Sequence, residues 1–194
     1  MDSKLIILRG NSGSGKTTTA LKLQELFGEA TLVVSQDVVR RDMLKVNDRE
    51  GNLSIELIKQ IAEYGLGKCP VVIVEGIMVN ERYKNMLLDL IHTFKPNVYT
   101  YYFDLPFDET LDRHKKRTKV NEFGEKEMRS WWNEKDYLGI PHERMIPKEL
   151  TQEEVVQIIV NDLKNWKKNI HMKKIYNSKK TLIILSLICY TKEH

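Results

Sequence analysis

Hydrophobic residues follow two repeating patterns along most of the chain. Short continuous apolar runs, typical of strands buried on both faces of a parallel sheet, occur at residues 4–9, 31–35, 70–74 and 98–103. Between these runs, apolar residues recur at helical spacing, which predicts helices over residues 17–27, 53–66 and 83–94. Strands that alternate with helices predict βαβ units, and therefore an α/β fold with a parallel sheet.

The pattern becomes less regular toward the C-terminal end. Residues 107–117 predict another helix, and residues 123–137, where aromatic and charged side chains mix, favour a helix from Glu127 onward. Residues 144–146 are compatible with a short fifth strand. Thr151 and Glu154 have the spacing of a capping box, which predicts that the last helix of the domain begins there.

Charge is distributed unevenly along the chain. The 194 residues carry a net charge of +4, but from residue 164 onward there are eight lysines and one acid. Residues 1–163 therefore hold 23 basic and 26 acidic side chains and are slightly acidic. We expect a domain at residues 1–165 and a lysine-rich tail at residues 166–194. Because the excess positive charge belongs to the tail, it does not indicate a polyanionic partner.

The tail contains an apolar run at residues 181–190, which is about half of a membrane span. We therefore expect no stable membrane insertion; an added strand or helix, an unstructured extension and a peripheral membrane contact remain open. No secretory signal precedes the first apolar run, so we expect a cytoplasmic protein. Cys69 and Cys189 lack paired spacing, and we expect both to be plain thiols. The sequence predicts no oligomeric state.

The strongest chemical signal is the segment GNSGSGKT at residues 10–17, which matches the pattern G-x-x-x-x-G-K-T. An apolar strand before it and an amphipathic helix after it argue against a chance glycine turn. In such a loop, backbone N–H groups surround a phosphate, Lys16 reaches the β- and γ-phosphates, and the Thr17 hydroxyl is a ligand of Mg²⁺. We expect ATP and Mg²⁺ as cofactors, with the nucleotide in contact with Gly10, Asn11, Ser12, Gly13, Ser14, Gly15, Lys16, Thr17 and Thr18.

Charged residues that follow the second strand suggest an acceptor site. Asp37 lies where neighbouring strands of a parallel sheet open into one crevice, so its carboxylate can orient or deprotonate an acceptor hydroxyl. The alternative is that Asp37 only caps the following helix. Arg40, one helical turn further, could hold an anionic group of the acceptor, and we assign Arg41 to the same acceptor site.

Two further positions suggest phosphate chemistry. Glu75 ends the third strand, where an acid holds Mg²⁺ through water; a purely structural glutamate is the alternative. Arg113 and Arg117 share one helix face, and cations above the triphosphate would stabilise the charge that develops on the transferred group. We interpret the other charges of this helix as a solvated face.

Taken in order, these segments resemble the small P-loop kinase group that includes bacteriophage polynucleotide 5′-kinase, the zeta-type sugar-nucleotide kinases and the antibiotic O-phosphotransferases. The resemblance spans about residues 4–164 and rests on the GNSGSGKT loop, Asp37-x-x-Arg40, the strand at 71–76, Phe103-Asp-Leu-Pro106, residues 109–117 and Arg129-Ser-Trp-Trp132. It implies a P-loop NTPase fold with a five-stranded parallel sheet in the order 2-3-1-4-5, helices on both faces and a helical lid at about residues 113–132.

The resemblance also implies roles for individual residues. Asp37 would be the general base and Arg40 an acceptor-binding residue. Arg113 would lie over the adenine and Arg117 on the phosphates, while the loop at residues 147–151 would line the adenine.

We therefore predict a kinase that moves the γ-phosphate of ATP to a hydroxyl of a small molecule, such as a nucleoside, a sugar nucleotide or an antibiotic. A polynucleotide 5′-hydroxyl kinase is the alternative, which the acidic domain does not favour. A different class would be an NTPase or a regulatory module, with water or no group as the acceptor. The chain has no N-K-x-D stretch of the kind that recognises guanine in GTPases. Trp131 and Trp132 could stack on an aromatic acceptor or belong to the core of the lid.

Overall fold

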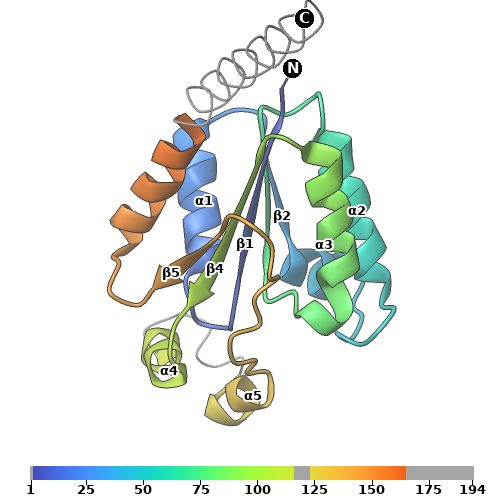
Figure 1. Ribbon diagram of the computed structural model, residues 1–194. Helices are drawn as coiled ribbons and strands as arrows, with labels where there is room; N and C mark the ends of the chain where they lie inside the picture. Colours follow the sequence, from blue (N-terminus) through green and yellow to red (C-terminus); the bar gives the residue numbers. More distant parts are fainter. Residues whose placement is uncertain (1, 116–122, 165–194) are drawn as a thin grey trace, which may run out of the picture. The chain divides into compact units, whose positions relative to one another are not determined.

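The computed structural model describes residues 2–115 and 123–164 (Figure 1). The chain divides into two compact units, Met1–Val156 and Gln157–His194. All the sites discussed below lie in the first unit. None of the helices within the described ranges is long and apolar enough to cross a membrane.

A five-stranded sheet forms the centre of the first unit, and every pair of neighbouring strands is parallel. The order β2-β3-β1-β4-β5 confirms the predicted fold and places the strand before the glycine loop in the middle of the sheet. The strands are β1 (Lys4–Gly10), β2 (Thr31–Ser35), β3 (Val71–Gly76), β4 (Val98–Asp104) and β5 (Glu143–Pro147).

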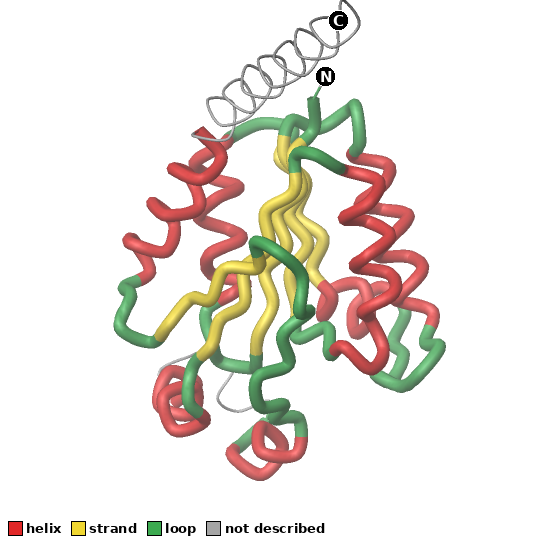
Figure 2. Tube along the Cα trace, in the orientation of Figure 1, coloured by secondary structure: helices red, strands yellow, loops and turns green. Residues whose placement is uncertain are grey.

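Helices connect these strands and lie on both faces of the sheet, as Figure 2 shows. They are α1 (Lys16–Phe27), the π-helix η1 (Val38–Met43), α2 (Leu53–Gly65), α3 (Asn80–Phe94), α4 (Phe107–Lys115) and α5 (Glu125–Ser130). A last helix begins at residue 152 and is described as far as residue 164. In the first unit, α1 covers one face of the sheet, and α2 and α3 cover the other.

The apolar run of β1 follows from burial on both faces. Leu5 and Ile7 belong to a core cluster that they share with α2 and α3. Side chains alternate along a strand, so Ile6 and Leu8 face the opposite side, and they too are fully buried. Each such side chain contributes about 1.5–3 kcal/mol by leaving water, which explains why residues 5–8 are all apolar.

The segment after α5 differs from the expected helix, which was to continue from Glu127 toward residue 137. Helix α5 ends at Ser130, and the following backbone binds side chains from elsewhere in the chain. The Asn133 N–H donates to the Asn11 side chain at 3.0 Å, and the Tyr137 carbonyl accepts from the Asn80 side chain. These long-range hydrogen bonds replace the helical ones, and spacing along the sequence does not reveal them.

Candidate active site

The glycine loop joins β1 to α1 and is held closely against β4 and α4. A Cβ atom at Gly10 would lie 2.7 Å from the Phe103 carbonyl oxygen, and one at Gly13 would lie 2.5 Å from the Thr110 carbonyl oxygen. Both glycines also have positive φ values, 138° and 85°. Only glycine satisfies both the space and the backbone conformation at these positions.

Lys16 lies in the first turn of α1, and its side chain is turned onto the loop. The ammonium group donates to the Asn11 carbonyl at 2.8 Å and to the Ser14 hydroxyl at 3.2 Å. Because the residue is only 6% exposed, its charge is held beside the backbone N–H groups that would surround a phosphate.

Three oxygen-bearing side chains meet where α1, β2 and β3 come together. The Thr17 hydroxyl donates to Glu75 Oε2 at 3.2 Å, and the Ser35 hydroxyl donates to Glu75 Oε1 at 2.6 Å. Glu75 is almost fully buried, at 3% exposure. Hydroxyl and carboxylate oxygens suit Mg²⁺, which keeps several waters and is bound through one or two carboxylates together with substrate phosphates.

Ser35 is a site residue that the sequence analysis missed. It ends β2 and lies in register with Glu75 on the neighbouring strand β3. A serine at the end of a predicted strand, two residues before Asp37, was the available signal. It becomes informative only when β2 and β3 are known to be neighbours.

Asp37 follows β2 directly, and its side chain is 57% exposed. Its carboxylate accepts from Arg40 Nη2 at 3.3 Å and from Arg41 Nε at 3.2 Å. Although Asp37 stands at the start of η1, it makes no capping hydrogen bond. The structure thus brings Asp37, Arg40 and Arg41 together and gives no support to the helix-cap interpretation.

A cleft of about 700 Å³ opens beside Asp37. Its walls come from η1 and the loop after it, from the loop before α3 and the first turn of that helix, and from residues 130–133. Arg82 and Lys45, which the sequence analysis did not single out, also line it. The cleft can hold a small organic molecule next to the Asp37 carboxylate.

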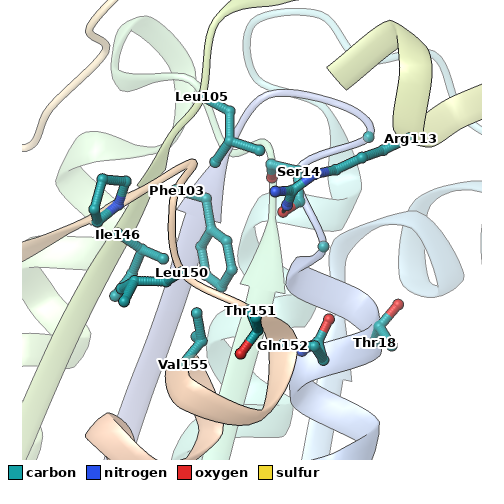
Figure 3. A pocket seen from close by; sticks show the side chains of 13 residues that line it. Ser14, Thr18, Phe103, Leu105, Arg113, Ile146, Leu150, Thr151, Gln152 and Val155 are labelled. Carbon is teal, nitrogen blue, oxygen red and sulfur yellow. Dashed lines mark hydrogen bonds between the residues drawn. The ribbon is translucent and has the colours of Figure 1, made fainter. Parts of the chain in front are cut away.

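A second cavity, of about 260 Å³, is lined in part by residues 13–15 of the glycine loop. Figure 3 shows the apolar side chains of Phe103, Ile146 and Leu150 on one side of it, with Arg113 reaching toward Ser14. Thr18 also lines this cavity. A mostly apolar pocket beside a phosphate-binding loop suits a nucleotide base.

Arg113 is held at the mouth of this second cavity by three contacts. Its Nε donates to Glu109 at 2.6 Å, while its Nη atoms donate to the carbonyls of Ser14 and Lys148 at 3.4 and 3.3 Å. Arg113 thereby connects the glycine loop with the loop before the last helix. Arg117 lies outside the described residues, so its predicted position above the phosphates stays a prediction.

The two adjacent tryptophans have different surroundings. Trp131 lines the cleft beside Asp37, and the Arg41 guanidinium lies 5.8 Å from the centre of its ring. Trp132 instead packs edge-on against Phe107, with ring centres 5.2 Å apart. Of this pair, Trp131 is therefore the one that faces the candidate acceptor cleft.

A buried charge cluster around Arg9 ties β1 to the segment after α5, and sequence reasoning missed it. Arg9, on β1, is fully buried and donates to Asp136 at 2.7 Å and twice to the Met78 carbonyl. Burial lowers the pKa of Arg9, while the carboxylates of Asp136 and Glu143 raise it. Burial also raises the pKa of Glu143, and nearby Arg9 opposes that increase. Burial is also the main reason why the pKa of the neighbouring Tyr102 is raised to about 12.

Comparison with known proteins agrees with this architecture. The model of a family described as an AAA domain matches residues 5–136. Among proteins with curated functions, none matches the sequence.

Several solved structures share the fold. A gluconokinase from Sinorhizobium meliloti is 14% identical, with a TM-score of 0.64 over 88% of this chain and 97% of its own. An APS kinase from Mycobacterium tuberculosis, solved with AMPPNP and APS, is 13% identical, with a TM-score of 0.60 over 84% and 98%. A tunicamycin resistance protein from Deinococcus radiodurans is 18% identical, with a TM-score of 0.56 over 83% and 95%. At these identities the likeness concerns the fold, which is that of P-loop kinases.

Proposed function

The chain belongs to the AAA domain family whose model matches it, and on that premise we propose that it is an ATP-dependent kinase. It would transfer the γ-phosphate of ATP to a hydroxyl group of a small molecule. The solved structures that share its fold include a gluconokinase and an APS kinase, which supports a phosphotransferase.

The observation that carries the proposal is the position of Asp37. Its exposed carboxylate lines the cleft of about 700 Å³, and it follows β2 only two residues after Ser35, which binds Glu75. Glu75 in turn accepts from Thr17, the residue after the P-loop lysine. An acceptor in the cleft would therefore have its hydroxyl near a base on one side and near the triphosphate on the other.

In this mechanism the cavity beside Arg113 holds the base, and the glycine loop holds the phosphates. Thr17 and Glu75 would hold Mg²⁺, directly and through water, and the ion would neutralise charge on the β- and γ-phosphates. Lys16 would exchange its contacts with the loop for phosphate oxygens. Arg113 would stabilise charge on the transferred group, together with Arg117 if that residue lies above the phosphates as predicted.

The chemical step is an in-line displacement. Asp37 accepts the proton of the acceptor hydroxyl while the hydroxyl oxygen forms a bond to the γ-phosphorus. The bond from this phosphorus to the oxygen that bridges the β- and γ-phosphates breaks, and ADP leaves with that oxygen. Arg40 and Arg41 hold the Asp37 carboxylate in place through their ion pairs.

The test is transfer of label from γ-labelled ATP to nucleosides, sugar nucleotides, aminoglycosides and 5′-hydroxyl oligonucleotides. Lys16→Ala should abolish transfer. Asp37→Asn should lower kcat by about a hundredfold or more while ATP still binds. Asp42→Asn is the matched control, because Asp42 is an exposed residue of η1 that does not line the cleft.

Unchanged turnover in Asp37→Asn would remove Asp37 from the mechanism. Label found only on oligonucleotides would favour the polynucleotide 5′-hydroxyl kinase, although the negative net charge of residues 1–163 does not favour strand binding. ATP consumption that needs no acceptor in any assay would indicate an NTPase instead.

A further inference from the structure

The charge of the acceptor cleft points to the kind of molecule that it accepts. We propose, resting on the proposed kinase function, that the acceptor carries an anionic group, a carboxylate or a phosphate, and that Arg82 binds this group. Arg82 lies in the first turn of α3, on a different wall of the cleft from η1, which carries Arg40 and Arg41.

The cleft is positive although the protein around it is not. Four basic side chains line it, those of Arg40, Arg41, Lys45 and Arg82, against the two acids Asp37 and Asp48. Residues 1–163 as a whole carry three more acids than bases. A positive cleft in a slightly acidic protein raises the local concentration of small anions.

Two of these four cations pair with Asp37 itself. Arg40 and Arg41 both bind the Asp37 carboxylate, at 3.3 and 3.2 Å. Arg40 also donates to the Val46 carbonyl at 3.2 Å. These contacts assign both arginines to the wall where the hydroxyl would react, and they leave Arg82 and Lys45 to meet the remainder of the acceptor.

Arg82 is the least well paired of the cations that the cleft buries. Its side chain is 24% exposed, and it reaches Asp48 only at 3.4 Å and the highly exposed Glu81 at 3.6 Å. Asp48 has a closer partner, because the Tyr83 hydroxyl donates to it at 2.8 Å. Within the described part of the chain, the buried Nε of Arg82 has no hydrogen-bond partner, and the same holds for the Nε of Arg40. The other nitrogens of Arg40 reach Asp37 and Val46 at 3.3 and 3.2 Å, closer than any described partner of Arg82.

A buried guanidinium N–H without an acceptor is unfavourable, since the group has lost its water. An anion in the cleft would supply that acceptor, and the planar fork of an arginine suits a carboxylate or a phosphate. Trp131, Ile77 and Val79 line the same cleft with apolar surface. The acceptor would thus present a hydroxyl to Asp37, an anion to Arg82 and a less polar middle to these side chains.

The experiment compares binding within pairs of compounds that differ in charge. Isothermal titration calorimetry is done with saturating AMPPNP and Mg²⁺, which block the ATP site. The pairs are glucuronate and glucose, glucose 6-phosphate and glucose, and UMP and uridine. We expect the anionic member of at least one pair to bind about tenfold more tightly than its neutral partner. The first two pairs distinguish a carboxylate from a phosphate.

Variants connect this preference to Arg82. Arg82→Gln should lose about tenfold in affinity for the anionic compound and leave the neutral one unchanged, and Arg82→Lys should fall between. Lys45→Gln, at an exposed position, should lose a factor of about two to three. Arg49→Gln is the control. Arg49 is an exposed arginine that directly follows the cleft residue Asp48 in the sequence but does not itself line the cleft. Thermal melting of each variant verifies that it folds.

The anionic-acceptor proposal fails if affinities are equal within every pair, if no anionic member binds, or if Arg82→Gln behaves like Arg49→Gln. Transfer of labelled phosphate is then measured with the same compounds. Tight binding of an anion without transfer would contradict the kinase function and support the anion site. Transfer to neutral members alone would support the kinase function and overturn the anion site.

Discussion

Replacing Arg9 with methionine would test how the strand before the glycine loop is tied to the segment after α5. The buried Arg9 guanidinium donates to the Met78 carbonyl at 3.1 and 2.9 Å and to Asp136 at 2.7 Å. Its Nη1 lies 3.6 Å from Glu143 Oε1. Methionine fills a similar part of the core but supplies neither the charge nor the donors.

The expected loss of stability follows from the groups left behind. Removing one partner of a buried ion pair costs about 3–5 kcal/mol, because the remaining charge is uncompensated. Here two carboxylates remain, and their side chains are only 19% exposed for Asp136 and 3% for Glu143. We expect the free energy of unfolding to fall by about 4 kcal/mol near neutral pH. At about 2–4 °C per kcal/mol, this lowers the melting temperature by roughly 10 °C.

The loss should shrink in acid. Burial raises the pKa of Glu143 in the folded protein, and Arg9 opposes that shift, so without Arg9 the pKa rises further. A carboxyl with a raised folded-state pKa favours folding below its unfolded pKa, and this contribution is lost as the pH rises through the folded pKa. The difference between Arg9→Met and the wild type should therefore be smaller at pH 5 than at pH 8.

Urea unfolding followed by circular dichroism at pH 5 and pH 8 measures both effects. Arg49→Met provides the control, because the same substitution at this exposed residue should change stability by no more than about 0.5 kcal/mol. A loss in Arg9→Met that equals the control, or one that grows at pH 5, would refute the reasoning.

Three further substitutions probe close contacts of the loop and the core. Gly13→Ala places a Cβ 2.5 Å from the Thr110 carbonyl oxygen and should weaken ATP binding by about tenfold or more. An unchanged affinity in calorimetry would show that the loop can move away from Thr110 without losing ATP binding. Asn11→Ala removes hydrogen bonds of 2.7 and 3.0 Å to the Asn133 backbone and should cost about 1–3 kcal/mol in urea unfolding; an unchanged midpoint would show that these bonds contribute nothing. Gly65→Ala places a Cβ 2.6 Å from a valine methyl group on β3 and should cost about 1–3 kcal/mol; a melting temperature equal to that of the wild type would mean that α2 moves away freely.

Local patterns were sufficient for most of the helices and strands and for the glycine loop, but not for the segment after α5. Apolar runs identify strands because both faces of this sheet are buried, as Leu5 and Ile6 on β1 illustrate. The glycine loop could be recognised because its residues are consecutive in the sequence. The five-stranded order came from the resemblance to P-loop kinases, and the observed sheet confirms it. Glu75 and Asp37 could be chosen because parallel strands end at one edge.

The remaining features depend on residues that are far apart in the sequence. Ser35 meets Glu75, and Arg9 meets Asp136, through pairings that span 40 and 127 positions. In the sequence, nothing around Arg82 distinguishes it from a surface arginine. Only the folded structure shows that it lines the cleft and that its Nε is buried without a hydrogen-bond partner among the described residues.

By itself, the sequence determined the strands, most of the helices and the glycine loop, because each depends on neighbouring residues and a regular period. The tertiary structure decided which charges share a cleft and which are buried in pairs. Those outcomes depend on desolvation and on contacts between distant segments, such as that of Asn11 with Asn133, and no local period encodes them.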